Sequence, residues 1–127
     1  MTQIRVVAGA IVKADKVLLA QRLEDASQGG LWELPGGKVE MGEVDAVALE
    51  RELSEELAIQ VEVEQFIAES VTHYPNKTVR LLAYRVTWVG GDICLHSHQK
   101  MVWVSVEDAL QYELCPADIP LLNAMLP

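Results

Sequence analysis

Short apolar runs in the first third of the chain are typical of strands. Val6 to Val12 is apolar and partly β-branched. A turn at Asp15-Lys16 leads into Val17 to Ala20, so these two apolar segments are expected to form a hairpin. Trp32-Glu33-Leu34 alternates like a further short strand, and Pro35-Gly36-Gly37 is expected to end it.

The periodicity becomes helical between Asp45 and Leu57. Ala46, Leu49, Leu53 and Leu57 recur at three- and four-residue spacing, which predicts one apolar stripe along a helix. The stripe is expected to pack this helix on a sheet, with the other faces of the helix left for polar residues.

The rest of the chain predicts strands followed by two short helices. The strands are expected over Val61 to Ser70, Thr78 to Val89 and Met101 to Val104, with turns at Pro75-Asn76 and Gly90-Gly91. The first helix is expected to begin with Val106 to Leu110. The second is expected to run from Pro116 or Asp118 to Met125. No repeat, low-complexity segment or linker interrupts the chain, so residues 1–127 are expected to form one domain of the α/β (α+β) class.

Composition narrows the possible partners. Half of the 127 residues are hydrophobic, which supports a single core, and the formal net charge is -9. An acidic surface repels a polyanion, so duplex nucleic acid is not an expected partner. A small nucleotide stays possible, since its phosphates can arrive bound to a cation.

Cysteine usage and hydropathy point to a cytoplasmic protein. Cys94 and Cys115 are the only cysteines and lack CxxC spacing, so they are interpreted as reduced thiols. The apolar run Val6 to Val12 is far shorter than the roughly 20 residues that span a bilayer. Arg5 precedes this run, but no signal-peptide cleavage site follows it, so no membrane association is expected.

Three carboxylates share one face of the expected central helix. Glu52, Glu55 and Glu56 are spaced i, i+3 and i+4, away from the leucine stripe. Their mutual repulsion costs a few tenths of a kcal/mol per pair. A divalent cation such as Mg²⁺ or Mn²⁺ would convert this repulsion into coordination, because these ions prefer carboxylate oxygens. Taken alone, the three glutamates also fit an ordinary solvated helix face.

The segment before this helix suits phosphate chemistry. Gly36-Gly37 permits unusual backbone angles and a close approach by a ligand, although two glycines alone are also typical of a turn. Lys38 can neutralise phosphate charge. Together with a metal held by carboxylates, these groups indicate phosphoryl chemistry.

Residues 37–59 resemble the Nudix box, GX5EX7REUXEEXGU, in which U is a bulky aliphatic residue. The matching positions are Gly37, Glu43, Arg51, Glu52, Leu53, Glu55, Glu56 and Ile59. The one departure is Ala58, which replaces the glycine of the pattern. Glycine serves there as a left-handed helix cap, so Ala58 is expected to cost some stability without removing a catalytic group.

The resemblance extends over nearly the whole chain, which is similar to the MutT branch of this family. The segment from Asp108 to Leu122 resembles the branch members that act on CTP. The resemblance implies an α/β/α sandwich around a mixed sheet, a monomer, and hydrolysis of a nucleoside triphosphate to the monophosphate and pyrophosphate. It leaves open whether the substrate is a cytidine nucleotide or an oxidised purine nucleotide such as 8-oxo-dGTP.

The resemblance also implies roles for individual residues. The metal ligands would be Glu52, Glu55, Glu56 and the backbone carbonyl of Gly36, with Mg²⁺ as the ion and Mn²⁺ as a substitute. Arg51 would orient these glutamates. The expected catalytic residues are therefore Glu52, Glu55, Glu56 and Arg51.

Four further residues form the expected substrate-binding group. Arg22 and Lys38 match positions that touch the phosphates, and Asp118 matches the position that reads the base edge. Glu43 would support the helix and its preceding loop. Asp118 also fits a helix start, because an early proline, Pro120, follows it. Tyr74 is a possible wall for the base.

One expected carboxylate is missing. Relatives in this branch carry a glutamate in the loop before the Met101 to Val104 strand, and the corresponding residue here is Ser97. A neutral serine cannot act as a base or as an ionised ligand. His96 or His98 can supply the base instead, since histidine titrates in the useful range. A box glutamate, Glu55 or Glu56, is the second option.

Low activity is the third option. It would make the chain a catalytically weak module that binds nucleotide and metal. Hydrolysis of another nucleoside diphosphate derivative, such as a nucleotide sugar, is the remaining alternative.

Overall fold

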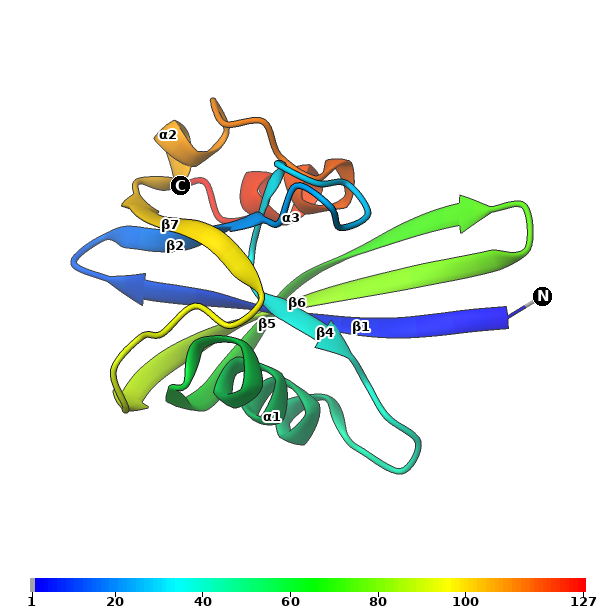
Figure 1. Ribbon diagram of the computed structural model, residues 1–127, viewed down its shortest axis with the longest axis horizontal. Helices are drawn as coiled ribbons and strands as arrows, with labels where there is room; N and C mark the ends of the chain where they lie inside the picture. Colours follow the sequence, from blue (N-terminus) through cyan, green and yellow to red (C-terminus); the bar gives the residue numbers. More distant parts are fainter. Residues whose placement is uncertain (1) are drawn as a thin grey trace.

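The computed structural model describes residues 2–127 as a mixed seven-stranded sheet with helices on both faces (Figure 1). The strands are β1 (Thr2–Lys13), β2 (Lys16–Arg22), β3 (Trp32–Glu33), β4 (Gly36–Lys38), β5 (Gln60–Tyr74), β6 (Lys77–Gly90) and β7 (His98–Val104). The helices are α1 (Asp45–Leu57), α2 (Val106–Ala109) and α3 (Ile119–Asn123), with a 3₁₀ turn, η1 (Pro116–Asp118), before α3. This arrangement confirms the α/β sandwich that the sequence predicts. No helix in this part of the chain is long and apolar enough to cross a bilayer.

Strand β1 organises the sheet. One of its edges pairs in parallel with β6, from Thr2–Lys77 to Ile11–Val86. The other edge has two partners in succession, because β4 pairs antiparallel with Val6 to Ala8 and β2 pairs antiparallel with Val12 and Lys13. Strands β3 and β7 then flank β2, and β5 flanks β6. The sheet therefore splits at β1 between β4 and β2.

The period-two alternation of β1 divides the core between its two faces. Val7 and Ile11 are fully buried on the face that α1 covers, whereas Ala8 and Ala10 are buried on the face that α2 and α3 cover. Figure 1 shows α1 on one side of the sheet and the two C-terminal helices on the other. A strand buried on both faces reads as a continuous apolar run, which explains the pattern in the sequence.

Helix α1 has the bounds that the sequence predicts, from Asp45 to Leu57. Its buried residues are Ala48, Leu49, Leu53 and Leu57, whereas Ala46 in the first turn is only partly buried. The apolar stripe therefore runs through Ala48 rather than Ala46. The opposite side of the helix keeps its glutamates away from the core.

The expectation that Pro35 to Gly37 only ends a strand is wrong, since Gly36 to Lys38 form β4. A Cβ atom on Gly36 would lie 1.9 Å from the carbonyl oxygen of Val7, so only glycine fits this pairing. Glycine has low strand propensity, which is why the segment resembles a turn in the sequence.

Ala58 caps α1 in the left-handed conformation, with φ 60° and ψ 30°, and its N–H donates to the carbonyl of Ser54 at 3.0 Å. An L-residue in this region costs about 1–2 kcal/mol, which glycine avoids. The departure from the box pattern therefore adds strain at the helix end that carries Glu55 and Glu56.

Candidate active site

The carboxylates of α1 lie beside the backbone of β4. The Gly36 N–H donates to Oε1 of Glu56 at 3.1 Å. A Cβ atom on Gly37 would lie 2.2 Å from Oε2 of Glu52, so this carboxylate occupies the space that a side chain would need. The Glu55 side chain is 59% exposed at the outer edge of the group. The two glycines thus let a strand and a row of carboxylates approach closely.

Arg51 connects these glutamates to the loop that precedes the helix. Its guanidinium donates to Glu43 at 2.8 and 2.9 Å, to Glu52 at 2.9 Å and to Glu55 at 3.4 Å. It also donates to the carbonyl of Lys38 at 3.0 Å. These hydrogen bonds raise the pKa of Arg51 and lower the pKa of Glu43 to about 2. Arg51 therefore stays charged and holds the loop against the helix.

Glu56 lies where a negative charge is unfavourable. Burial, followed by the nearby charges of Glu33 and Glu52, raises the pKa of Glu56 to about 8. The hydrogen bond from Gly36 acts in the opposite direction but does not compensate. A carboxyl group in this environment gains from either a proton or a bound cation.

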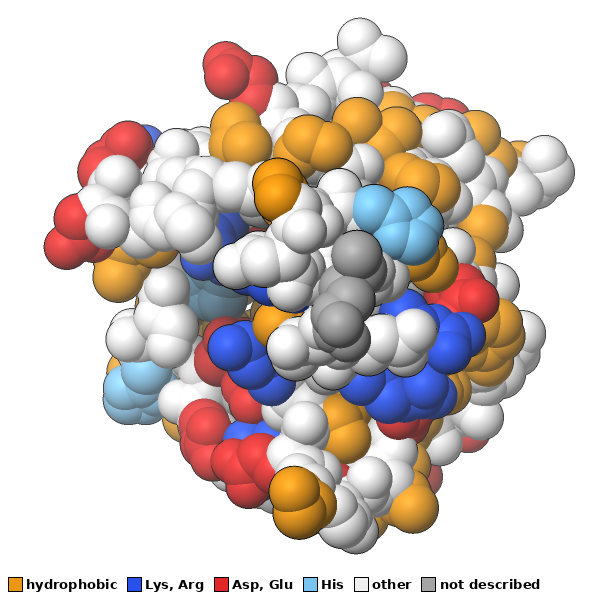
Figure 2. Space-filling model, turned by 90° about the vertical axis from the view of Figure 1, so that its right-hand side faces the viewer, with side chains coloured by type: hydrophobic (Ala, Val, Ile, Leu, Met, Phe, Trp, Pro, Cys, Tyr) orange, Lys and Arg blue, Asp and Glu red, His pale blue; other side chains and the backbone are white. Residues whose placement is uncertain are grey.

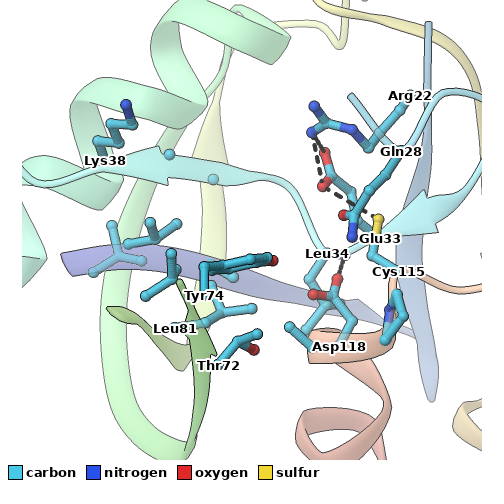
Figure 3. A pocket seen from close by; sticks show the side chains of 18 residues that line it. Arg22, Gln28, Glu33, Leu34, Lys38, Thr72, Tyr74, Leu81, Cys115 and Asp118 are labelled. Carbon is cyan, nitrogen blue, oxygen red and sulfur yellow. Dashed lines mark hydrogen bonds and ion pairs between the residues drawn. The ribbon is translucent and has the colours of Figure 1, made fainter. Parts of the chain in front are cut away.

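A cavity of about 420 Å³ adjoins this group and shares Gly36 and Gly37 with it. The close-up in Figure 3 shows Lys38 at one end of the cavity and Asp118 and Cys115 toward the other, with Tyr74 along one side. Its chemically distinctive lining residues are Arg22, Glu33, Lys38, Tyr74, Cys115 and Asp118. The end of the cavity away from Lys38 is the more enclosed one, and Arg22 and Glu33 lie on that side (Figure 3).

Asp118 lies at the enclosed end and is only 3% exposed. Its Oδ2 accepts a hydrogen bond from the Leu34 N–H at 2.7 Å. Burial, with a further contribution from the charge of Glu33, raises the pKa of Asp118 to about 8. Helix α3 does begin directly after Asp118, but the side chain makes no capping hydrogen bond. Asp118 is therefore located at a helix start, as predicted, but its carboxylate does not cap the helix.

Glu33 is a site residue that the sequence did not reveal. Its Oε1 lies 3.2 Å from NH1 of Arg22, and its Oε2 lies 2.9 Å from Nε2 of His98. Within Trp32-Glu33-Leu34, strand alternation assigns Glu33 to an outward face, and nothing local marks it as a cavity residue. The only available signal was a single carboxylate next to Pro35-Gly36-Gly37.

The loop that carries Ser97 lies at the C-terminal end of α1. The N–H groups of Cys94 and His96 donate to the carbonyls of Leu57 and Glu56 at 2.9 and 3.0 Å. Ser97 is exposed, and His98 is buried. Position 97 is therefore close to the carboxylate helix.

The structure brings most of the expected substrate-binding residues together. Arg22, Lys38 and Asp118 all line the cavity, whereas Glu43 does not and instead binds Arg51 and the Glu40 N–H. Figure 2 shows acidic and basic side chains next to each other around a hollow on this end of the molecule.

The donor set fits a hard divalent cation by its chemistry. Glu52, Glu55 and Glu56 offer carboxylate oxygens, and the glycines of β4 let the Glu52 and Glu56 carboxylates lie directly against the strand. Among residues 2–127, however, no three acidic, histidine or cysteine side chains already converge as a metal centre. Arg51 engages Glu52 and Glu55, so these side chains would have to turn for coordination.

Comparison with known proteins agrees with this geometry. A family model described as NUDIX domain matches residues 3–125. The chain is 46% identical to the CTP pyrophosphohydrolase of Escherichia coli, with 99% of this chain and 93% of that protein covered. It is 41% identical to a protein of Mycobacterium tuberculosis named putative 8-oxo-dGTP diphosphatase 2, with 89% and 81% covered.

Solved structures show the same similarity. The solution structure of the E. coli ORF135 protein superposes with a TM-score of 0.91 at 46% identity, covering 98% of this chain and 89% of that chain. The crystal structure of a MutT protein from Methanosarcina mazei superposes with a TM-score of 0.86 at 26% identity, covering 96% and 91%.

The two glycines of β4 should respond differently to alanine. Gly36→Ala places a Cβ against the backbone of β1, so the free energy of unfolding should fall by about 3 kcal/mol or more. Gly37→Ala instead displaces the movable carboxylate of Glu52, so stability should change by less than about 1 kcal/mol while Mg²⁺ affinity falls at least about tenfold. Urea unfolding and metal titration calorimetry measure both effects. Equal losses of stability in the two variants would contradict the contrast between a rigid backbone beside Gly36 and a movable side chain beside Gly37.

Proposed function

The chain belongs to the Nudix hydrolase family, and on this premise we propose that it hydrolyses a nucleoside triphosphate to the monophosphate and pyrophosphate. The observation that carries the proposal is the junction at Gly36 and Gly37, where the carboxylates of α1 adjoin a cavity of about 420 Å³. Relatives named CTP pyrophosphohydrolase and 8-oxo-dGTP diphosphatase support this reaction. Such an enzyme would clean the nucleotide pool. We place it in the cytoplasm as a monomer.

Nudix hydrolases generally use a divalent metal, and we propose Mg²⁺ here, with Mn²⁺ as a substitute. Glu52, Glu55, Glu56 and the Gly36 carbonyl would hold the ion, which when bound polarises the phosphate and lowers the pKa of a water. Arg51 keeps the glutamates on one side of α1, since it donates to two of them.

Two cations of the cavity lining suit the phosphates. Lys38 on β4 and Arg22 on β2 can neutralise phosphate charge that the acidic chain would otherwise repel. Tyr74 offers an aromatic surface on the cavity wall.

Asp118 favours a cytosine base over a guanine-type base. Its pKa of about 8 keeps the carboxyl protonated at neutral pH, so it presents one donor and one acceptor. Cytosine offers the complement, since its N3 accepts and its N4 amine donates. The matching edge of guanine or 8-oxoguanine offers two neighbouring donors, which suit an ionised carboxylate better. We therefore propose a cytidine-type triphosphate as the preferred substrate.

A panel of triphosphates tests this function. Pyrophosphate release with Mg²⁺ should be fastest for CTP, dCTP or 5-methyl-dCTP at pH 7, ahead of dGTP, 8-oxo-dGTP and a nucleotide sugar. The cytidine advantage should shrink above pH 8, because Asp118 then ionises. A preference for 8-oxo-dGTP at pH 7 would contradict the assignment of the base. If no member of the panel is hydrolysed, the second candidate remains, which is a nucleotide-binding module weakened by Ser97.

Glu56→Gln separates a catalytic defect from a folding defect. Turnover should fall by about 100-fold or more, because a metal ligand is lost. Without metal the variant should be more stable than the parent at pH 8, by about 3–6 °C in Tm. The parent pKa is raised in the folded state, so stability present below about pH 4.5 is lost as the pH rises to 8, and glutamine avoids this loss. Near-normal turnover would contradict the metal assignment.

Ser97→Glu restores the carboxylate that relatives carry. Because the loop is attached to the end of α1, turnover should equal or exceed that of the parent. Ser97→Gln, which matches the size without the charge, is the control and should give no gain. A large loss in Ser97→Glu alone would mean that this chain activates water by a different arrangement.

A further inference from the structure

Two strands direct side chains to a carboxylate on a third strand that lines the cavity. Glu33 comes from β3, Arg22 from the end of β2 and His98 from the start of β7. Nε2 of His98 lies 2.9 Å from Oε2 of Glu33, and NH1 of Arg22 lies 3.2 and 3.3 Å from the two Glu33 oxygens. Figure 3 shows Arg22 above Glu33, with the interaction between them dashed.

His98 is built into the interior, unlike its neighbours in the loop. Its side chain is only 2% exposed, and its Nδ1 is buried without a hydrogen-bond partner. Burying an imidazole with one unsatisfied nitrogen lowers the stability of the fold, so its presence calls for a functional reason. The polar contact of this ring is with Glu33, so the reason lies in that contact. The ring does not line the cavity, which makes direct proton transfer to substrate a poor explanation of its placement.

A β-bulge sets this geometry. Strands β2 and β7 pair Gln21 with Lys100 but Arg22 with His98, so Gln99 is left outside the ladder. The Gln99 amide donates to the Arg22 carbonyl at 2.8 Å and to Glu24 at 3.0 Å. The bulged segment therefore holds both the backbone of Arg22 and, through His98 and Glu33, its guanidinium.

Arg22 is otherwise held only by one loop residue. Its Nε donates to the Ser27 carbonyl at 2.6 Å, and its NH2 donates to the Ser27 hydroxyl at 3.2 Å. Glu33 supplies the remaining contact, an ion pair with NH1 of the guanidinium at 3.2 Å. If Glu33 were free to rotate, NH1 of Arg22 would lose its partner, and only the hydrogen bonds to Ser27 would orient the guanidinium at the cavity wall.

We infer that His98 is a positioning residue for Arg22, acting through Glu33, so that a buried imidazole on β7 fixes the cation that binds the triphosphate. This inference rests on the proposed function for its substrate. It also assigns a role to the loop that lacks the carboxylate of relatives, and that role is binding rather than proton transfer.

A matched pair of variants tests the contact. Glutamine can place an amide N–H near the position of Nε2, whereas asparagine is one methylene shorter and cannot reach Glu33. His98→Asn should raise the KM for the preferred triphosphate about tenfold with kcat changed less than about threefold, and His98→Gln should restore KM to within about threefold. Cys94→Ala, at an exposed position of the same loop with no assigned role, is the control and should change neither. Equal KM values for the asparagine and glutamine variants would overturn the inference.

A double-mutant cycle tests the route through Arg22. In an Arg22→Ala background, His98→Asn should have no further effect on KM, because the residue that it positions is gone. Independent, multiplying effects would overturn the inference even if each single variant is impaired. Thermal melts of all variants show whether each remains folded, and the glutamine variant keeps the comparison informative if asparagine destabilises the chain.

A measurement without substrate separates this inference from the proposed function. The Nε2 proton of His98 should give an exchange-protected resonance in ¹H NMR of the parent, and Glu33→Ala should remove this protection. If that resonance is present but no triphosphate is hydrolysed, the contact stands and the proposed substrate is wrong. If the parent shows no protected proton while it hydrolyses triphosphate, the positioning role of His98 is wrong.

Discussion

The close approach of β4 to both β1 and α1 is the constraint on which the site depends. Gly36 fits against the carbonyl of Val7 with no room for a Cβ atom, and Gly37 fits against the Glu52 carboxylate, which a Cβ atom would displace. This contact brings a helix face rich in negative charge to the rim of a cavity. The split of the sheet at β1 then opens that cavity toward β2 and the C-terminal segment.

Electrostatics divides the site into two different environments. Arg51 gathers Glu43, Glu52 and Glu55 around one cation, whereas Glu56 and Asp118 are buried carboxyls with strongly raised pKa values. Glu56 belongs to the carboxylate group beside β4, and Asp118 lies at the enclosed end of the cavity. The same physical penalty, burial of charge, thus favours a cation at one end and a proton at the other.

The sequence predicted what local spacing can encode. The bounds of α1, the glutamate face and the positions of the hairpins follow from period and turn residues, and Asp118 was identified through resemblance. The sequence did not predict β4, because two consecutive glycines resemble a turn. This strand forms only by pairing with the backbone of β1. The sequence missed the contact between Glu33 and His98 because those residues are 65 positions apart and meet only through the pairing of β2 with both β3 and β7.

The hydrogen bond from Leu34 to Asp118 spans 84 residues and has a consequence for synthesis of the protein. The segment after α2 also pairs with β3, since the Trp32 N–H donates to the Glu113 carbonyl and the Cys115 N–H donates to the Trp32 carbonyl. The carboxylate helix leaves the ribosome well before this segment does. A nascent chain would therefore hold its anionic group before residues 113–118 are available to close the other end of the cavity, and that end forms only after those residues have been synthesised.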